Sequence, residues 1–74
     1  MGSNVYLDNV HLEAERARDK WGPFRSTHEA LGVLVEELDE LRAAIHANDT
    51  DAARHESMQV AAVAYRFYRD GWER

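Results

Sequence analysis

Cysteine is absent from this chain, which excludes a disulfide framework and a thiolate metal site. Proline occurs once and glycine four times, so few positions interrupt a regular backbone. No apolar run approaches the roughly 20 residues that span a membrane, and no secretory signal is visible. The formal net charge of −5 argues against nucleic acid or an anionic membrane as a partner. We therefore expect a soluble, cytoplasmic protein that binds neither.

The length of the chain sets a second limit. Its 74 residues make one domain, residues 1–74, in which Met1-Gly2-Ser3 has the form of a cloning remnant. A chain this short rarely buries enough apolar surface to be stable alone, and no disulfide can supply the difference. Assembly with further copies is the remaining common solution. We therefore expect a homodimer or a dimer of dimers.

Three amphipathic segments account for most of the chain. Apolar residues recur every three to four positions over residues 4–20, and Pro23 ends that pattern. The capping box Ser26-Thr27-His28-Glu29 begins a second helix over about 27–47. A short polar turn leads to a third helix over about 50–70, and Gly71 is a natural stop. The sequence therefore predicts an all-α fold, a three-helix unit with an antiparallel pair that completes a helical bundle by oligomerisation.

The middle of the second helix is acidic. Because each residue turns about 100° around a helix, Glu37 and Glu40 lie side by side at the edge of the apolar face. Asp39 turns to the other flank. A solvated helix face is the alternative interpretation of such an acidic run. The apolar face itself, expected to be a core face, consists of Leu31, Leu34, Leu38, Leu41 and Ile45.

The third helix carries a carboxylate on an apolar face. Glu56 falls among small and large apolar residues, with Gln59 bordering them, and a buried carboxylate needs a partner or a metal. Because the turn before this helix is short, the second and third helices should run antiparallel as neighbours. Glu37, Glu40, Glu56 and Gln59 then converge between them. The apolar residues around Glu56 are Ala53, Val60, Val63, Ala64 and Phe67.

The pattern Glu36-Glu37-x-x-Glu40 followed by Glu56-x-x-Gln59 resembles the MazG-like all-α nucleoside triphosphate pyrophosphatases. In that family Glu-Glu-x-x-Glu precedes Glu-x-x-Asp, and the acids hold Mg²⁺. The resemblance implies a single MazG-like helical domain with Glu37, Glu40, Glu56 and Gln59 as metal ligands, for Mg²⁺ or alternatively Mn²⁺. Gln59 stands where the family has Asp, and an amide oxygen can bind a hard cation but brings no charge.

The resemblance covers residues 18–70 and includes Trp21-Gly22 and His28-Glu29. It implies cleavage of a nucleoside triphosphate into the monophosphate and pyrophosphate. Glu36 is the candidate for activating the attacking water. Lys20 and Arg25 are candidate phosphate-binding groups, as is Arg54 nearby, although each is also an ordinary surface charge. Trp21 either stacks on a base or closes the core.

Two functions from different classes remain open on these residues. The first is the Mg²⁺-dependent pyrophosphohydrolase, favoured by Glu36-Glu37-x-x-Glu40 and by Glu56. The second is a non-catalytic helical oligomer that keeps this fold for assembly or nucleotide binding, favoured by Gln59. For the assembly, a second apolar face of the third helix predicts an interface that contains Tyr65 and Tyr68. That face consists of Met58, Ala61, Tyr65 and Tyr68.

Overall fold

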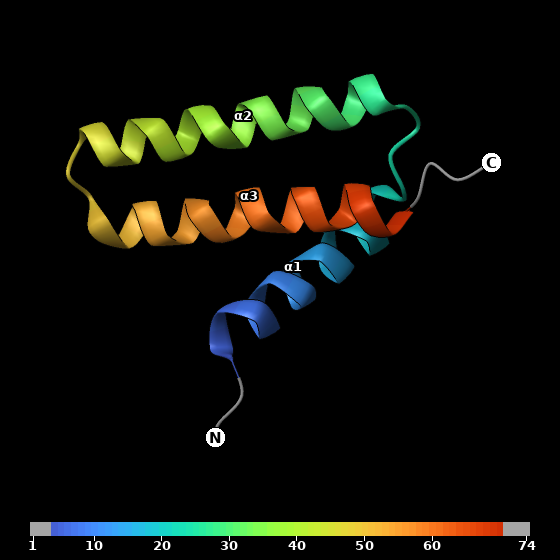
Figure 1. Ribbon diagram of the computed structural model, residues 1–74, viewed down its shortest axis with the longest axis horizontal. Helices are drawn as coiled ribbons and strands as arrows, with labels where there is room; N and C mark the ends of the chain where they lie inside the picture. Colours follow the sequence, from blue (N-terminus) through green and yellow to red (C-terminus); the bar gives the residue numbers. More distant parts are fainter. Residues whose placement is uncertain (1–3, 71–74) are drawn as a thin grey trace.

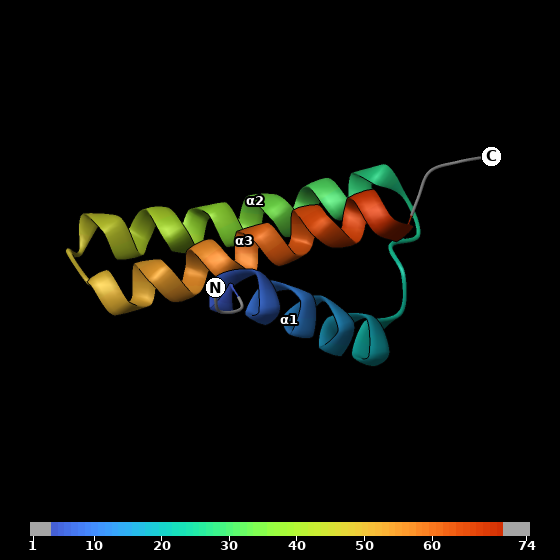
Figure 2. The ribbon, with the colours of Figure 1, turned by 60° about the horizontal axis from the view of Figure 1, so that its bottom comes forward.

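The computed structural model describes residues 4–70, which form three α-helices and no strand. They are α1 (Val5–Trp21), α2 (Thr27–His46) and α3 (Thr50–Asp70). Helices α2 and α3 run antiparallel side by side, and α1 crosses the opposite side of α3 (Figure 1). Figure 2 shows α3 lying between the other two helices. The predicted all-α fold with its antiparallel helix pair is therefore confirmed.

Local capping accounts for the ends of α1. The side chain of Asn4 accepts a hydrogen bond from the amide of Leu7 at 3.1 Å, which fixes the start of the helix. At the other end, Gly22 has φ of 77° and donates its amide to the Arg18 carbonyl at 2.7 Å. Glycine tolerates this left-handed φ because it has no Cβ, so the chain can leave the helix here.

Caps also begin α2 and α3. Ser26 Oγ accepts from the amide of Glu29 at 3.0 Å, as the capping box predicts. The carboxylate of Glu29 accepts from the amide of Arg25 at 2.6 Å, which ties the linker before α2 to its first turn. Asp49 caps α3 by accepting from the amide of Ala52 at 3.0 Å. The starts of all three helices thus follow from short polar residues beside them.

Small side chains form the core. Alanines and valines allow the helices to approach closely, and no large described side chain is fully buried. Two clusters share α3 as their common wall. Between α1 and α3 lie Val10, Ala14 and Ala62, flanked by Met58, Ala61 and Tyr65. Between the linker, α2 and α3 lie Phe24, Ala30 and Val63, flanked by Val33 and Leu34.

The second apolar face of α3 is covered within the chain. Met58, Ala61 and Tyr65 pack against α1, and the Tyr65 ring centroid lies 5.8 Å from that of His11. The expectation that Tyr65 faces a partner subunit is therefore wrong in this structure, because α1 crosses α3 on this side. Tyr68, one turn further, is 84% exposed.

The expected core face of α2 is also partly wrong. Leu34 and Leu41 are half-buried, but Leu31, Leu38 and Ile45 are 56%, 45% and 57% exposed. The reason is that α1 packs on α3 and not on α2 among the described residues, so no helix covers this stripe. Val35, at 46% exposure, extends it.

Ion pairs connect α1 to the C-terminal turn of α3. Arg69 pairs with Glu15 of α1 and lies 3.4 Å from Asp70. Arg18 of α1 donates to the same Asp70 carboxylate at 2.7 Å. No described helix is both long and apolar enough to cross a membrane. Met1-Gly2-Ser3 and the predicted stop at Gly71 lie outside the described residues.

Candidate metal and phosphate site

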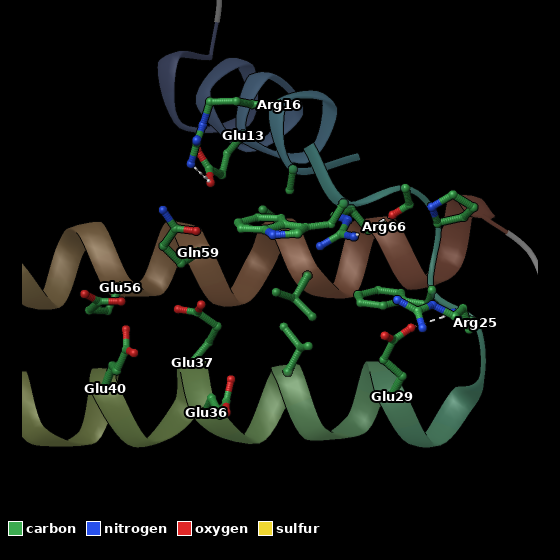
Figure 3. Close-up of a pocket in the computed structure, with 18 of the residues that line it drawn as sticks. Glu13, Arg16, Arg25, Glu29, Glu36, Glu37, Glu40, Glu56, Gln59 and Arg66 are labelled. Carbon is green, nitrogen blue, oxygen red and sulfur yellow. Dashed lines mark hydrogen bonds and ion pairs between the residues drawn. The ribbon is translucent and has the colours of Figure 1, made fainter. Parts of the chain in front are cut away.

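A cavity of about 530 Å³ lies over α3, between α1 on one side and α2 on the other, with the α1–α2 linker closing one end (Figure 3). It exists because α1 and α2 both pack on α3 but diverge from each other. Acidic side chains line one end, and arginine and aromatic side chains line the other. The cavity therefore has one acidic end, and at its other end Arg25 and Arg66 lie with a single acid, Glu29.

Three carboxylates meet at the acidic end. Glu37 and Glu40 extend from α2 toward α3, and Glu56 faces them from α3 (Figure 3). One oxygen from each of the three lies within 4.8 Å of the others. The i, i+3 spacing puts the two acids of α2 on one face, and the antiparallel turn brings Glu56 level with them. The convergence that the sequence predicted for the three carboxylates is present.

Repulsion within this cluster is not relieved by the described protein residues. Burial raises the pKa of Glu37, and so do the negative charges of Glu40 and Glu56 and a hydrogen bond that the protonated acid can make to Glu56. Glu37 Oε1 and Glu56 Oε1 are buried, and neither accepts a hydrogen bond from any described residue. Buried carboxylate oxygens need a proton, a donor or a cation. A divalent cation bound here would supply a partner to all three carboxylates at once.

Glu36 and Gln59 flank the three carboxylates. Glu36 is exposed, lines the same cavity, and its charge contributes to the raised pKa of Glu37. Gln59 lines the cavity too, on the side of α3 nearer α1 (Figure 3). Its amide nitrogen lies 3.4 Å from Nε2 of His55. The amide therefore borders the carboxylate cluster from the α1 side.

The other candidate residues are divided between the cavity and the surface. Trp21 and Arg25 line the cavity, and Trp21 is 61% exposed, so the interpretation of Trp21 as a core residue is wrong. The Lys20 ammonium lies 4.8 Å from the centroid of the Trp21 ring and outside the cavity lining. Arg54 lines a separate shallow depression beside the α2–α3 turn. The structure therefore brings only Trp21 and Arg25 of these four to the cavity.

Sequence reasoning missed Arg66, which lines the end of the cavity opposite the acids. Only 5% of this residue is exposed. Its guanidinium carbon lies 4.2 Å from the centroid of the Phe24 ring, and one of its terminal nitrogens donates to the Gly22 carbonyl at 3.2 Å. The signal was available in the spacing, since Arg66 follows Gln59 by seven residues and so lies on the same helix face.

Comparison with known protein families, curated proteins and solved structures gives no match to this chain. The resemblance to the MazG-like group therefore consists of the sequence motifs alone. Any function proposed for this chain has to be supported by the geometry of the acidic residues in the cavity, because no related protein supports it.

Proposed function

We propose that this protein is a Mg²⁺-dependent nucleoside triphosphate pyrophosphohydrolase of the MazG-like type, with Mn²⁺ as an alternative ion. The observation that carries the proposal is the approach of Glu37, Glu40 and Glu56 to within 4.8 Å beside a cavity of about 530 Å³. A nucleotide-sized ligand needs a cavity of this order. Nucleotides and Mg²⁺ are abundant in the cytoplasm, which is where we expect the protein to act.

The donor set suits a hard cation. Mg²⁺ prefers oxygen ligands, and proteins usually bind it with few carboxylates plus water and substrate phosphates. Glu37 and Glu56 each present a buried oxygen without a hydrogen-bond donor among the described residues. Glu40 is exposed and can turn toward the same ion. Gln59 is the fourth candidate ligand, through its amide oxygen.

The chain supplies a base at the edge of this cluster. Glu36 is exposed at the cavity wall, where its carboxylate can take a proton from water as the water oxygen bonds to the α-phosphorus. The bond from that phosphorus to its bridging oxygen breaks, and the oxygen leaves with pyrophosphate. When bound, Mg²⁺ polarises the phosphoryl oxygens and offsets their charge. The choice of the α–β bond comes from the family resemblance alone.

A second copy of the chain completes the fold in this proposal. Leu31, Val35, Leu38 and Ile45 form an exposed apolar stripe along α2, and a helix that is apolar on two sides requires cover on both. A homodimer, or a dimer of dimers, buries this stripe against its equivalent. The core of the single chain consists mainly of alanine and valine, so the additional burial would stabilise it substantially.

The alternative function is a non-catalytic helical oligomer that binds nucleotides or only assembles. Gln59 favours it, because the amide adds no negative charge and lies on the α1 side of α3. Such a protein would keep the cavity and the apolar stripe while losing turnover. The two functions differ in a single measurable product.

Pyrophosphate release is the deciding measurement. A panel of nucleoside triphosphates is incubated with the protein while Mg²⁺ is titrated, and pyrophosphate and monophosphate are quantified together. Glu56→Gln should abolish release, whereas Asp39→Asn should not, because Asp39 is exposed and outside the cavity lining. Equal activity of the two variants, or none in the wild type with any nucleotide, would overturn the proposal and leave the non-catalytic function.

A further inference from the structure

Arg66 is a buried cation without an anionic partner among the described residues. Its side chain is almost fully enclosed, yet no described carboxylate lies within ion-pairing distance of it. Within residues 4–70 its one hydrogen bond goes to a neutral carbonyl, that of Gly22, and its Nε has no partner there. A charge taken out of water without a counter-ion is strongly unfavourable. An anion bound beside Arg66 would supply the missing counter-charge and remove this cost.

The neighbouring acids pair with other groups, although Asp70 Oδ2 is also buried and accepts no hydrogen bond from any described residue. Asp70, one turn further along α3, pairs with Arg18 and Arg69. Glu29 accepts from the amide of Arg25. Burial lowers the pKa of Arg66, although these acids partly offset that effect. The guanidinium thus keeps donor capacity that the described protein residues do not use.

The same cavity connects Arg66 to the carboxylate cluster. Ten residues separate it from Glu56 along α3, which corresponds to about 15 Å of helix axis. Glu37 of α2 lies on the Arg66 side of Glu40 and Glu56, so the acid cluster extends along the cavity toward the guanidinium (Figure 3). A ligand that satisfies both ends must carry a cation at one end and negative charge at the other.

We propose that Arg66 binds the terminal phosphates of a polyphosphate whose other phosphates are held with the divalent cation at Glu37, Glu40 and Glu56. This inference rests on the proposed function and specifies the ligand class as a metal-complexed triphosphate. Arginine presents a planar fork of donors that matches phosphate oxygens, and a phosphate supplies the missing counter-charge. A neutral nucleobase beside Phe24 would leave that charge uncompensated.

Binding of inorganic triphosphate is the direct probe, because it has neither base nor sugar. Calorimetry in saturating Mg²⁺ compares the wild type with Arg66→Met and with Arg54→Met, the same substitution at an exposed arginine of α3 outside the cavity. We expect Arg66→Met to weaken triphosphate binding at least about tenfold, the equivalent of one charge-assisted hydrogen bond. Arg54→Met should leave the Kd within about twofold, as expected for a remote surface charge.

Thermal unfolding without ligand separates binding from a structural role. Replacing a buried, unpaired charge by an apolar side chain of similar length should leave the melting temperature unchanged or raise it. Arg66→Lys keeps the charge but loses the fork, so we expect triphosphate affinity between those of the wild type and Arg66→Met. A variant Arg66→Met that melts lower and binds triphosphate as tightly as the wild type would overturn the inference. So would a larger loss of affinity for a nucleoside monophosphate than for triphosphate.

The outcomes also distinguish this inference from the proposed function. Triphosphate binding that depends on both Arg66 and Mg²⁺ but leads to no pyrophosphate release would support the inference and overturn the hydrolase. Mg²⁺-dependent release of pyrophosphate that persists at wild-type affinity in Arg66→Met would support the hydrolase and overturn the inference. Wild-type protein that binds no triphosphate at all would overturn both.

Discussion

Glu37 of α2 and Glu56 of α3 face each other across the helix pair, and each has a buried Oε1 with no hydrogen-bond partner among the described residues. Two such oxygens beside Glu40 destabilise the helix pair unless a proton or a cation is shared between them. The site is therefore a local weakness of the fold in the absence of ligand. Its stability should respond to metal, to pH and to removal of charge, and each response can be measured.

Mg²⁺ should stabilise the wild-type protein by binding the folded state alone. At roughly 100-fold excess over its Kd, linkage predicts a gain of about 2.7 kcal/mol in the free energy of unfolding. Glu37→Gln should melt higher than the wild type without metal, because one repelling charge is gone, and should lose most of the response to Mg²⁺. Differential scanning calorimetry with Asp39→Asn as the control checks this. An equal response to Mg²⁺ in Glu37→Gln and in the wild type would show that the ion binds elsewhere.

The pH dependence follows from the raised pKa of Glu37. Its ordinary value is 4.5, and burial together with Glu40 and Glu56 raises it in the folded protein. A group whose folded pKa lies above its unfolded value stabilises the fold most below the unfolded pKa, and this contribution is lost as pH rises through the folded pKa. Without metal, stability should therefore fall as pH increases from about 4.5, relative to a Glu37→Gln variant that lacks this titration.

Urea unfolding across that pH range, with wild type and Glu37→Gln in parallel, isolates the contribution of this residue. Saturating Mg²⁺ should reverse the difference, because the ion binds the deprotonated carboxylates and its affinity rises with pH. A constant difference between the two proteins at all pH values would mean that Glu37 titrates at its ordinary value.

Helix positions and the acid cluster were predictable because both depend on local rules. Asn4, Ser26 and Asp49 mark the helix starts through side-chain hydrogen bonds that any short polar residue at a cap can make. The short turn after α2 then forces an antiparallel neighbour, which brings Glu56 beside the acids of α2. Neither inference requires knowledge of where α1 packs.

The path of α1 was not predictable from helical periodicity, and the errors follow from that. Periodicity shows that a helix has an apolar face but not which neighbour covers it. Once α1 crosses α3, Tyr65 is covered from within the chain, while Leu38 on α2 stays uncovered. The same crossing encloses Arg66, whose burial depends on Gly22 and Phe24 in the linker. The burial of Tyr65, Leu38 and Arg66 thus depends on where α1 packs, which the sequence pattern does not show.

The exposed stripe of α2 predicts self-association. We expect sedimentation of the wild type at micromolar concentration to give a dimer or a tetramer, and Leu38→Glu to give the monomer with its helical circular dichroism retained. A charge placed in a buried apolar interface is unfavourable by several kcal/mol, on the order of 3 or more, whereas on an open surface it is tolerated. Leu12→Glu, an equally drastic change at an exposed leucine of α1, is the control and should still associate. A wild-type protein that sediments as a monomer would contradict self-association through this stripe.

Gln59 separates catalysis from assembly most directly, because this amide stands where a carboxylate would complete the charge of the site. With one charge fewer, the wild type should bind Mg²⁺ weakly alone, and nucleotide phosphates should supply the missing charge. Metal and nucleotide would then tighten each other's binding by the same factor. Gln59→Asp should raise the affinity for Mg²⁺ without nucleotide at least about tenfold, or ~1.4 kcal/mol. Gln59→Asn is the matched control, since it has the length of aspartate without the charge.

Calorimetric titration of the three proteins with Mg²⁺ gives the answer. If the aspartate joins the ion, only Gln59→Asp gains affinity, and its melting temperature rises above that of Gln59→Asn when Mg²⁺ is added. If no ion binds here, the new carboxylate adds repulsion to a cluster that already contains Glu37, Glu40 and Glu56. Gln59→Asp then melts below Gln59→Asn with and without Mg²⁺. That result would show that no metal binds at this site and would overturn the proposed hydrolase function.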